Sequence, residues 1–208
     1  MVISMDEKKI QEYINKYKNY IVYIVSIIPG DTLYKEIINI FCDAIPNSLV
    51  INNINNTCLI SNVENINVNE IVNAIIDDTG INICVYKSNK LTSIKAFEIV
   101  NNMFNKYSPK INESFITNRM LIEEMFNNDI DDLNTFKPIV LETIEKDIKL
   151  FEIVNGMFVN NLNVSKTANY VYMHRNTINN KLNVIKQETG LDIQNFQDAV
   201  MLYVLIKK

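Results

Sequence analysis

The sequence predicts an α+β protein: an N-terminal mixed-sheet α/β layer domain followed by an all-helical domain. The chain has 208 residues, enough for two small domains at roughly 100 residues each. Short β-branched runs alternate with helical periodicity as far as residue 116, and only helical patterns follow. We expect the two domains to span residues 1–130 and 131–208.

The N-terminal domain is predicted from the order of its apolar patterns. An amphipathic helix over 6–19 precedes a nearly continuous apolar strand over 20–28, which Pro29-Gly30 ends. The elements that follow are, in order, a helix that stops near Pro46, a hairpin of strands over 48–52 and 57–62, a helix over 67–78 that ends at Gly80, a strand over 81–87, a helix over 92–106 and an edge strand over 111–116. This order predicts a mixed sheet with helices packed on it.

The second half of the chain shows helical periodicity alone. Helices are predicted over 118–127, 136–147, 150–160, 164–171, 175–188 and 194–207. Short polar turns separate them.

Composition excludes several classes of protein. Three cysteines without C-x-x-C spacing and a single histidine argue against disulfides, zinc sites and multi-histidine metal sites, so we expect no metal and no cofactor. The N-terminus lacks the pattern of a signal peptide, and no apolar run reaches about 18 residues. We therefore expect a soluble, cytoplasmic protein with no membrane segment.

Charge is distributed unevenly along the chain. Residues 147–208 carry a net charge of +2 and residues 1–146 a net charge of −6. No acidic residue lies between Glu152 and Glu188, an interval that holds three lysines, one arginine and the histidine. Local positive charge of this kind suits a phosphate backbone, although a short basic helix face is the plainer interpretation.

Within this interval the sequence has the layout of a helix-turn-helix. A short helix over 164–171, a turn at Tyr172-Met173 and a second helix over 175–188 follow one another. In such motifs the second helix enters the DNA major groove. Ile178, Leu182 and Ile185 are spaced to face the core, so the opposite face of that helix is the one available to DNA.

That opposite face carries Arg, Asn and Lys, which pair with guanine, adenine and phosphate respectively. The predicted DNA-binding residues are Ser165, Lys166, Thr167, His174, Arg175, Asn176, Thr177, Asn179, Asn180, Lys181, Asn183 and Lys186. Among these, Arg175, Asn176, Asn179 and Asn180 are the candidates for base contacts. Two alternatives stay open: His174 and Thr177 can simply cap and tighten the turn, and the asparagines can reflect an abundance of Asn throughout the chain.

The motif resembles a known family. N-L-N-V-S at 161–165, T-A at 167–168, H-R-N-T at 174–177 and T-G-L-D at 189–192 are similar to the C-terminal DNA-binding domain of PucR/CdaR-type transcriptional regulators. Asn180-Lys181 stands where that family has Tyr-Arg, so base preference is expected to differ. The motif is also similar to the Fis-type helix-turn-helix, with Tyr172 in place of its turn glycine.

The family resemblance implies more about the N-terminal half. Such regulators often carry a degenerate GGDEF-like α/β domain before the helix-turn-helix, and residues 20–105 have a matching order of elements. No G-G-D-E-F sequence is present, nor any acidic metal pair at the turn where that sequence would lie. We therefore expect a regulatory or dimerisation domain rather than a cyclase.

The leading hypothesis is a transcriptional regulator that binds double-stranded DNA as a homodimer and responds to a small-molecule or protein effector through residues 1–130. The apolar helix over 196–206 would pair two copies or pack under its own domain. The alternative is a signalling or protein-interaction module with weak or lost DNA binding. An enzyme is not expected, because the sequence has no Gly-rich phosphate loop and no nucleophile constellation.

Overall fold

The computed structural model describes residues 5–27, 33–63 and 66–207. By their internal packing these residues form two compact units, 1–117 and 118–208. The predicted α+β fold class is confirmed. The division falls at Thr117 rather than at residue 130 because helix α5 (Asn118–Asn128) packs on helices α6 and α10 of the C-terminal unit.

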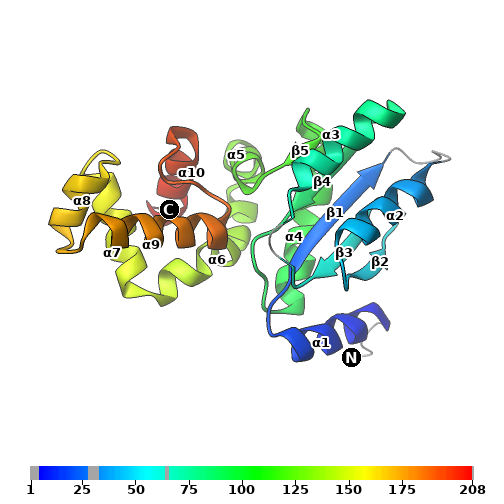
Figure 1. Cartoon of the computed structure of the whole chain (residues 1–208), viewed down its shortest axis with the longest axis horizontal. Helices are drawn as coiled ribbons and strands as arrows, with labels where there is room; N and C mark the ends of the chain where they lie inside the picture. Colours follow the sequence, from blue (N-terminus) through cyan, green and yellow to red (C-terminus); the bar gives the residue numbers. More distant parts are fainter. Residues whose placement is uncertain (1–4, 28–32, 64–65, 208) are drawn as a thin grey trace. The chain divides into compact units, whose positions relative to one another are not determined.

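The described part of the N-terminal unit contains a five-stranded sheet in the order β2-β3-β1-β4-β5 (Figure 1). Its strands are β1 (Ile21–Ile27), β2 (Leu49–Asn52), β3 (Thr57–Ser61), β4 (Ile83–Lys87) and β5 (Phe115–Ile116). Strands β4 and β5 run parallel and the other pairs run antiparallel, so the predicted mixed sheet and hairpin are confirmed. The central strand β1 is nearly continuous in apolar residues because helices cover both faces of the sheet.

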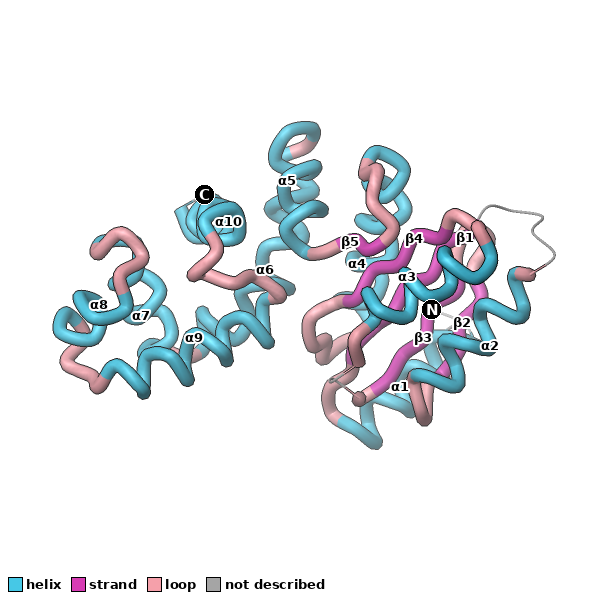
Figure 2. The backbone as a smooth tube through the Cα atoms, turned by 45° about the horizontal axis from the view of Figure 1, so that its top comes forward, coloured by secondary structure: helices cyan, strands magenta, loops and turns pink. Residues whose placement is uncertain are grey.

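Alternate residues of β1 face two different helical layers. Tyr23 and Val25 join a core with helices α2 (Tyr34–Ala44) and α3 (Val68–Thr79). On the other face, helix α4 (Ile94–Tyr107) contacts β1, and its Phe104 ring lies 6.2 Å from that of Tyr86 on β4. Helix α1 (Met5–Tyr17) packs on α4 and β2. Figure 2 shows the strands enclosed by these helices.

The edge strand is shorter than predicted. Only Phe115 and Ile116 pair with β4, whereas the sequence predicted a strand over 111–116. A 3-10 turn over Ser108–Lys110 carries the chain away from the end of α4, and it reaches β4 only when Ser114 O accepts the amide of Val85 at 2.8 Å.

The described part of the C-terminal unit is helical throughout, as predicted. Its helices are α5, α6 (Ile130–Lys146), α7 (Ile148–Val159), α8 (Val164–Tyr170), α9 (Arg175–Thr189) and α10 (Phe196–Lys207). Helix α6 begins six residues before the predicted Phe136 because Asp129 caps it, accepting the amides of Asp131 and Asp132. Phe136, Ile178 and Leu202 are among the fully buried residues that form the core of this unit.

Three further observations concern the composition. Cys42, Cys58 and Cys84 are free thiols, and burial raises the pKa of Cys58 to about 12. No group of three potential metal ligands gathers among the described residues. None of the described helices is long and apolar enough to cross a membrane.

Candidate nucleic-acid interface

Helices α8 and α9 form the predicted helix-turn-helix. Asn163 caps α8 by accepting the amide of Lys166 at 3.0 Å. Between the helices, the amide of Met173 donates to Ala168 O at 2.9 Å and that of Tyr172 to Asn169 O at 3.4 Å. These two bonds form a Schellman motif, which requires a left-handed residue at its turn. Tyr172 supplies that residue, with φ of 54°.

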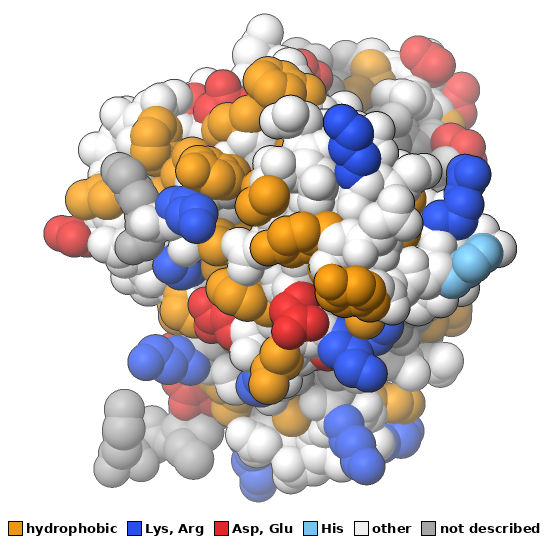
Figure 3. All heavy atoms as spheres, turned by 90° about the vertical axis from the view of Figure 1, so that its left-hand side faces the viewer, with side chains coloured by type: hydrophobic (Ala, Val, Ile, Leu, Met, Phe, Trp, Pro, Cys, Tyr) orange, Lys and Arg blue, Asp and Glu red, His pale blue; other side chains and the backbone are white. Residues whose placement is uncertain are grey.

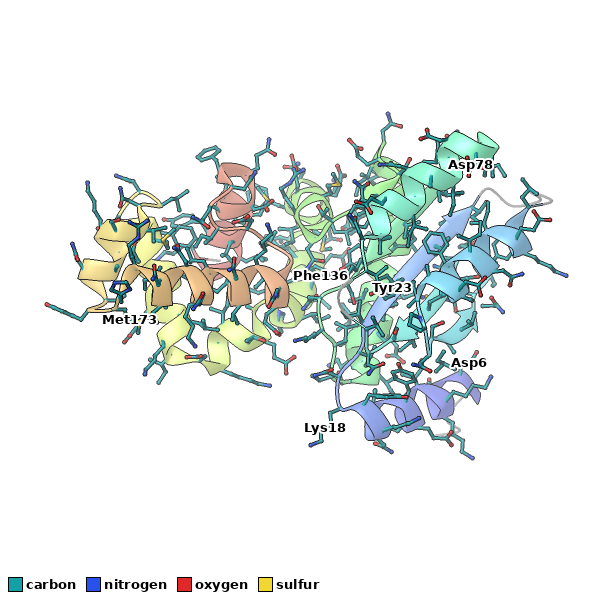
Figure 4. All side chains as sticks on the ribbon, viewed as in Figure 1. Asp6, Lys18, Tyr23, Asp78, Phe136 and Met173 are labelled. Atoms are coloured by element: carbon teal, nitrogen blue, oxygen red, sulfur yellow. The ribbon has the colours of Figure 1, made fainter. Side chains whose placement is uncertain are left out.

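His174 begins the second helix as its N-cap. Its Nδ1 accepts the amide of Asn176 at 3.3 Å. Figure 4 shows Met173 in the turn just before this cap. Of the two alternatives for His174, capping is therefore what the structure shows, and the exposed ring leaves Nε2 accessible to a further partner.

The buried face of α9 is the predicted one. Ile178, Leu182 and Ile185 are buried against the unit, and Thr189 ends the same stripe. Gly190 then adopts φ of 71° as the C-cap, and Thr189 O accepts Nδ2 of the buried Asn118 at 2.6 Å. This packing leaves only one side of α9 for a partner.

Most of the predicted site residues lie on that accessible side. The exposed ones are Ser165, Lys166, His174, Arg175, Asn176, Thr177, Asn180, Asn183 and Lys186, with Asn179 and Lys181 half-buried. Figure 3 shows the pale-blue histidine, which is His174 because the chain has one, beside lysine and arginine side chains in blue. The structure thus brings eleven of the twelve residues to the surface of one motif.

Thr167 is the exception, and its prediction as a DNA-binding residue is wrong. It is fully buried between α8 and α7, where its hydroxyl donates to Gly156 O at 3.2 Å. Gly156 permits this close approach, since a Cβ on it would lie 3.1 Å from Cγ2 of Thr167. Thr167 therefore joins helices rather than contacting a partner.

The helix-turn-helix has less unpaired positive charge in the structure than its sequence alone predicts. Nζ of Lys181 lies 3.6 Å from a carboxylate oxygen of Asp147, and Nζ of Lys186 lies 2.8 Å from one of Asp192. Both acids lie outside the acid-free interval of the sequence, but the folded chain brings them next to α9. Lys166 and Arg175 have no salt bridge with the described residues. The unpaired positive charge therefore lies near the starts of the two helices, α8 and α9.

The pKa values of the two acids follow from these contacts. Desolvation acts to raise the pKa of Asp147, but the amides of Leu150 and Lys149 and the charge of Lys181 outweigh it and hold that pKa below its ordinary value. The hydrogen bond from Lys186 lowers the pKa of Asp192 in the same direction. Both carboxylates are therefore stabilised in the charged form.

The sequence predicted α10 as a possible pairing helix, but not the groove that α10 forms with α7 on the same unit. Phe158, Leu162, Phe196, Val200 and Tyr203 line an open groove of about 340 Å³ between α7 and α10. The Phe196 side chain is 75% exposed, and the Tyr203 ring packs edge-on to Phe158 at 5.2 Å. Leu202 and Leu205 point into the core, so α10 packs under its own domain and presents a second apolar face outward.

Comparisons with known proteins identify the C-terminal region. Residues 150–207 match the model of the PucR C-terminal helix-turn-helix domain. The carbohydrate diacid regulator of Escherichia coli (strain K12) is 34% identical over 67 residues, which are 32% of this chain and 17% of that relative. The crystal structure of a regulator of polyketide synthase expression from Bifidobacterium adolescentis aligns over 99% of this chain and 86% of its own, with 12% identity and a TM-score of 0.44. The PucR/CdaR-type resemblance is thus confirmed for residues 150–207, which match the PucR C-terminal helix-turn-helix domain, and the chain spans under a fifth of the length of the curated relative.

Proposed function

We propose that this protein is a DNA-binding transcriptional regulator and that α9 enters the major groove of its operator. The observation that carries the proposal is the division of α9 into a buried stripe and an outward face of Arg and Asn at the start of the helix. An α-helix fits the major groove, and its first turns reach the base edges. The match of residues 150–207 to a regulator family supports this function.

The outward side chains divide into two roles by their chemistry. Arg175, Asn176, Asn179 and Asn180 lie in the first two turns of α9, where a guanidinium reads guanine and a carboxamide reads adenine. Ser165 and Lys166 lie at the start of α8, where an exposed hydroxyl and an exposed ammonium suit a phosphate.

The remaining exposed residues would support these contacts. Thr177, Asn183 and Nε2 of His174 are placed to meet sugar or phosphate oxygens. Lys181 and Lys186 contribute less, because Asp147 and Asp192 already neutralise them.

A homodimer would provide the second half-site that helix-turn-helix proteins generally bind. The α7–α10 groove supplies a suitable pairing surface, since Phe158, Val200 and Tyr203 are apolar and none of the residues that line it is charged. A two-fold interface places each patch against its own copy, so an uncharged patch avoids like-charge repulsion. Replacing Tyr203 by Glu should convert a dimer to a monomer in sedimentation velocity runs, and an unchanged dimer would exclude this surface.

We assign a non-enzymatic regulatory role to the N-terminal unit. The order of its helices and strands supports the resemblance to a degenerate GGDEF-like domain. It would receive a small-molecule or protein effector. A cytoplasmic location is part of the same proposal, because the protein must reach DNA.

The function is tested by selecting bound fragments of genomic DNA and measuring their affinity over a range of salt concentrations. The double variant Arg175→Ala, Asn179→Ala should lose sequence preference, whereas Lys8→Ala, at an exposed position of α1 in the other unit, should bind as the parent does. Equal binding by the double variant at every salt concentration would contradict the groove assignment.

One observation favours a second candidate, a signalling or protein-interaction module with weak or lost DNA binding. Two of the four cations of the motif are paired with acids, which lowers the attraction to phosphate. That candidate predicts no salt-sensitive binding to any selected duplex.

A further inference from the structure

The turn between α8 and α9 carries an aromatic side chain that does not pack into the core of the protein. Tyr172 is 96% exposed, and no hydrogen bond, ion pair or ring contact joins its side chain to any described residue. Exposed tyrosines are ordinary on protein surfaces, but this one lies two residues before His174, the N-cap of the helix that we assign to the groove.

The backbone of Tyr172 is strained. Its φ of 54° places it in the left-handed region, which glycine adopts freely and a tyrosine with its Cβ does not. The Schellman bonds of the turn require this conformation whatever the residue is. Glycine would therefore make the same turn without strain. The exposed tyrosine side chain makes no packing contact that would offset the strain of its backbone.

The surroundings of Tyr172 point to an anionic partner. Lys166 and Arg175 are exposed cations in the same helix-turn-helix, and Tyr170 adds a second ring that is 56% exposed. No acidic residue occurs between Glu152 and Glu188 in the sequence. The acids that return to the motif, Asp147 and Asp192, pair with Lys181 and Lys186, which are further along α9.

We propose that Tyr172 binds the sugar–phosphate backbone at the edge of the groove that α9 enters, with its hydroxyl donating to a phosphate oxygen and its ring lying against a deoxyribose. This inference rests on the proposed function. Tyrosine hydroxyls are regular donors to DNA phosphates, and such contacts fix the register of a protein on the duplex without reading its sequence. The strained turn keeps the ring in the position where the recognition helix begins.

The test uses fluorescence anisotropy with the full chain, on a duplex recovered by genomic selection and on an unrelated duplex of the same length. Tyr172→Gly should melt at the same or a higher temperature than the parent, since it relieves strain. Its affinity should fall about tenfold or more on both duplexes, which is the loss expected for one hydrogen bond to a charged group with its apolar contact. Tyr172→Phe should recover part of that loss because it keeps the ring.

Asn47→Gly is the matched control. Asn47 also has positive φ, of 57°, but lies in the N-terminal unit, and the change alters no charge. It should leave DNA affinity unchanged.

The outcomes separate the inference from the function on which it rests. If the parent binds DNA and Tyr172→Gly binds equally well, the Tyr172 contact is overturned while the proposed function stands. A lower melting temperature for Tyr172→Gly would overturn the premise of strain. If the parent binds neither duplex at low salt, the proposed function fails and the inference falls with it.

Discussion

Thr167 and Gly156 form a close junction between α8 of the helix-turn-helix and α7. The Thr167 hydroxyl donates to Gly156 O at 3.2 Å, and its methyl group lies 3.1 Å from the position of a Cβ on Gly156. Side chains of Tyr170 and Val171 would each approach that Cβ to 3.3 Å. The backbone of α7 is thus in direct contact with α8.

Replacing Gly156 with alanine should therefore destabilise the protein, although alanine is the better helix former. The helix preference alone would stabilise by about 0.5–1 kcal/mol, whereas overpacking of a filled site costs about 1–3 kcal/mol. We expect a net loss of about 1 kcal/mol in chemical denaturation. Glu152→Ala, on the exposed side of α7, is the control and should be nearly neutral; a Gly156→Ala variant more stable than the parent would show that the junction is loose.

The cap of α9 gives a second prediction. His174→Ala removes the acceptor of the Asn176 amide and should lower the free energy of unfolding by about 1 kcal/mol, whereas His174→Asn supplies another good cap and should retain it. Thermal melts of the two variants would distinguish capping from a role in binding alone. Equal losses for Ala and Asn would mean that the cap contributes nothing to stability.

Features of the fold and site that depend on neighbouring residues in the sequence could be predicted, whereas those that depend on packing between distant residues could not. The stripe of Ile178, Leu182 and Ile185 follows from the helical repeat, and the end of α3 at Gly80 follows from the preference of glycine for the αL cap, so both were predicted correctly. The pairing of Lys181 with Asp147 was not predictable, because 34 residues separate them and only the packing of the helices brings them together. Thr167 was misassigned because a polar residue inside a DNA-binding motif also suits phosphate, whereas its hydroxyl contacts Gly156 on another helix.

Acid should weaken the C-terminal unit. The pKa values of Asp147 and Asp192 lie below their ordinary value of 3.8 in the folded protein, so unfolding at low pH takes up protons. Their contribution to stability is fully present above pH 3.8 and is lost as the pH falls through the lower pKa values of the folded protein. Asp147→Asn, which keeps the cap of α7, should flatten the pH dependence of unfolding below pH 4 when stability is measured by urea titration. Unchanged slopes in that range would exclude these carboxylates as the acid-sensitive groups.

The pairing of Lys186 with Asp192 should limit the affinity for DNA. The Asp192 carboxylate neutralises a cation on the outward face of α9 and also carries its own charge toward any phosphate that approaches. Asp192→Asn removes that charge, and its amide oxygen can still accept the amide of Gln194, so the loop keeps its local geometry. Affinity should rise, and the dependence of log Kd on log salt should steepen by about 0.9, the slope of one additional phosphate contact.

Asp78→Asn in the N-terminal unit makes the same change of net charge and is the control. If both variants bind alike, general repulsion explains the gain; if only Asp192→Asn binds more tightly, the ion pair itself restrains the recognition helix.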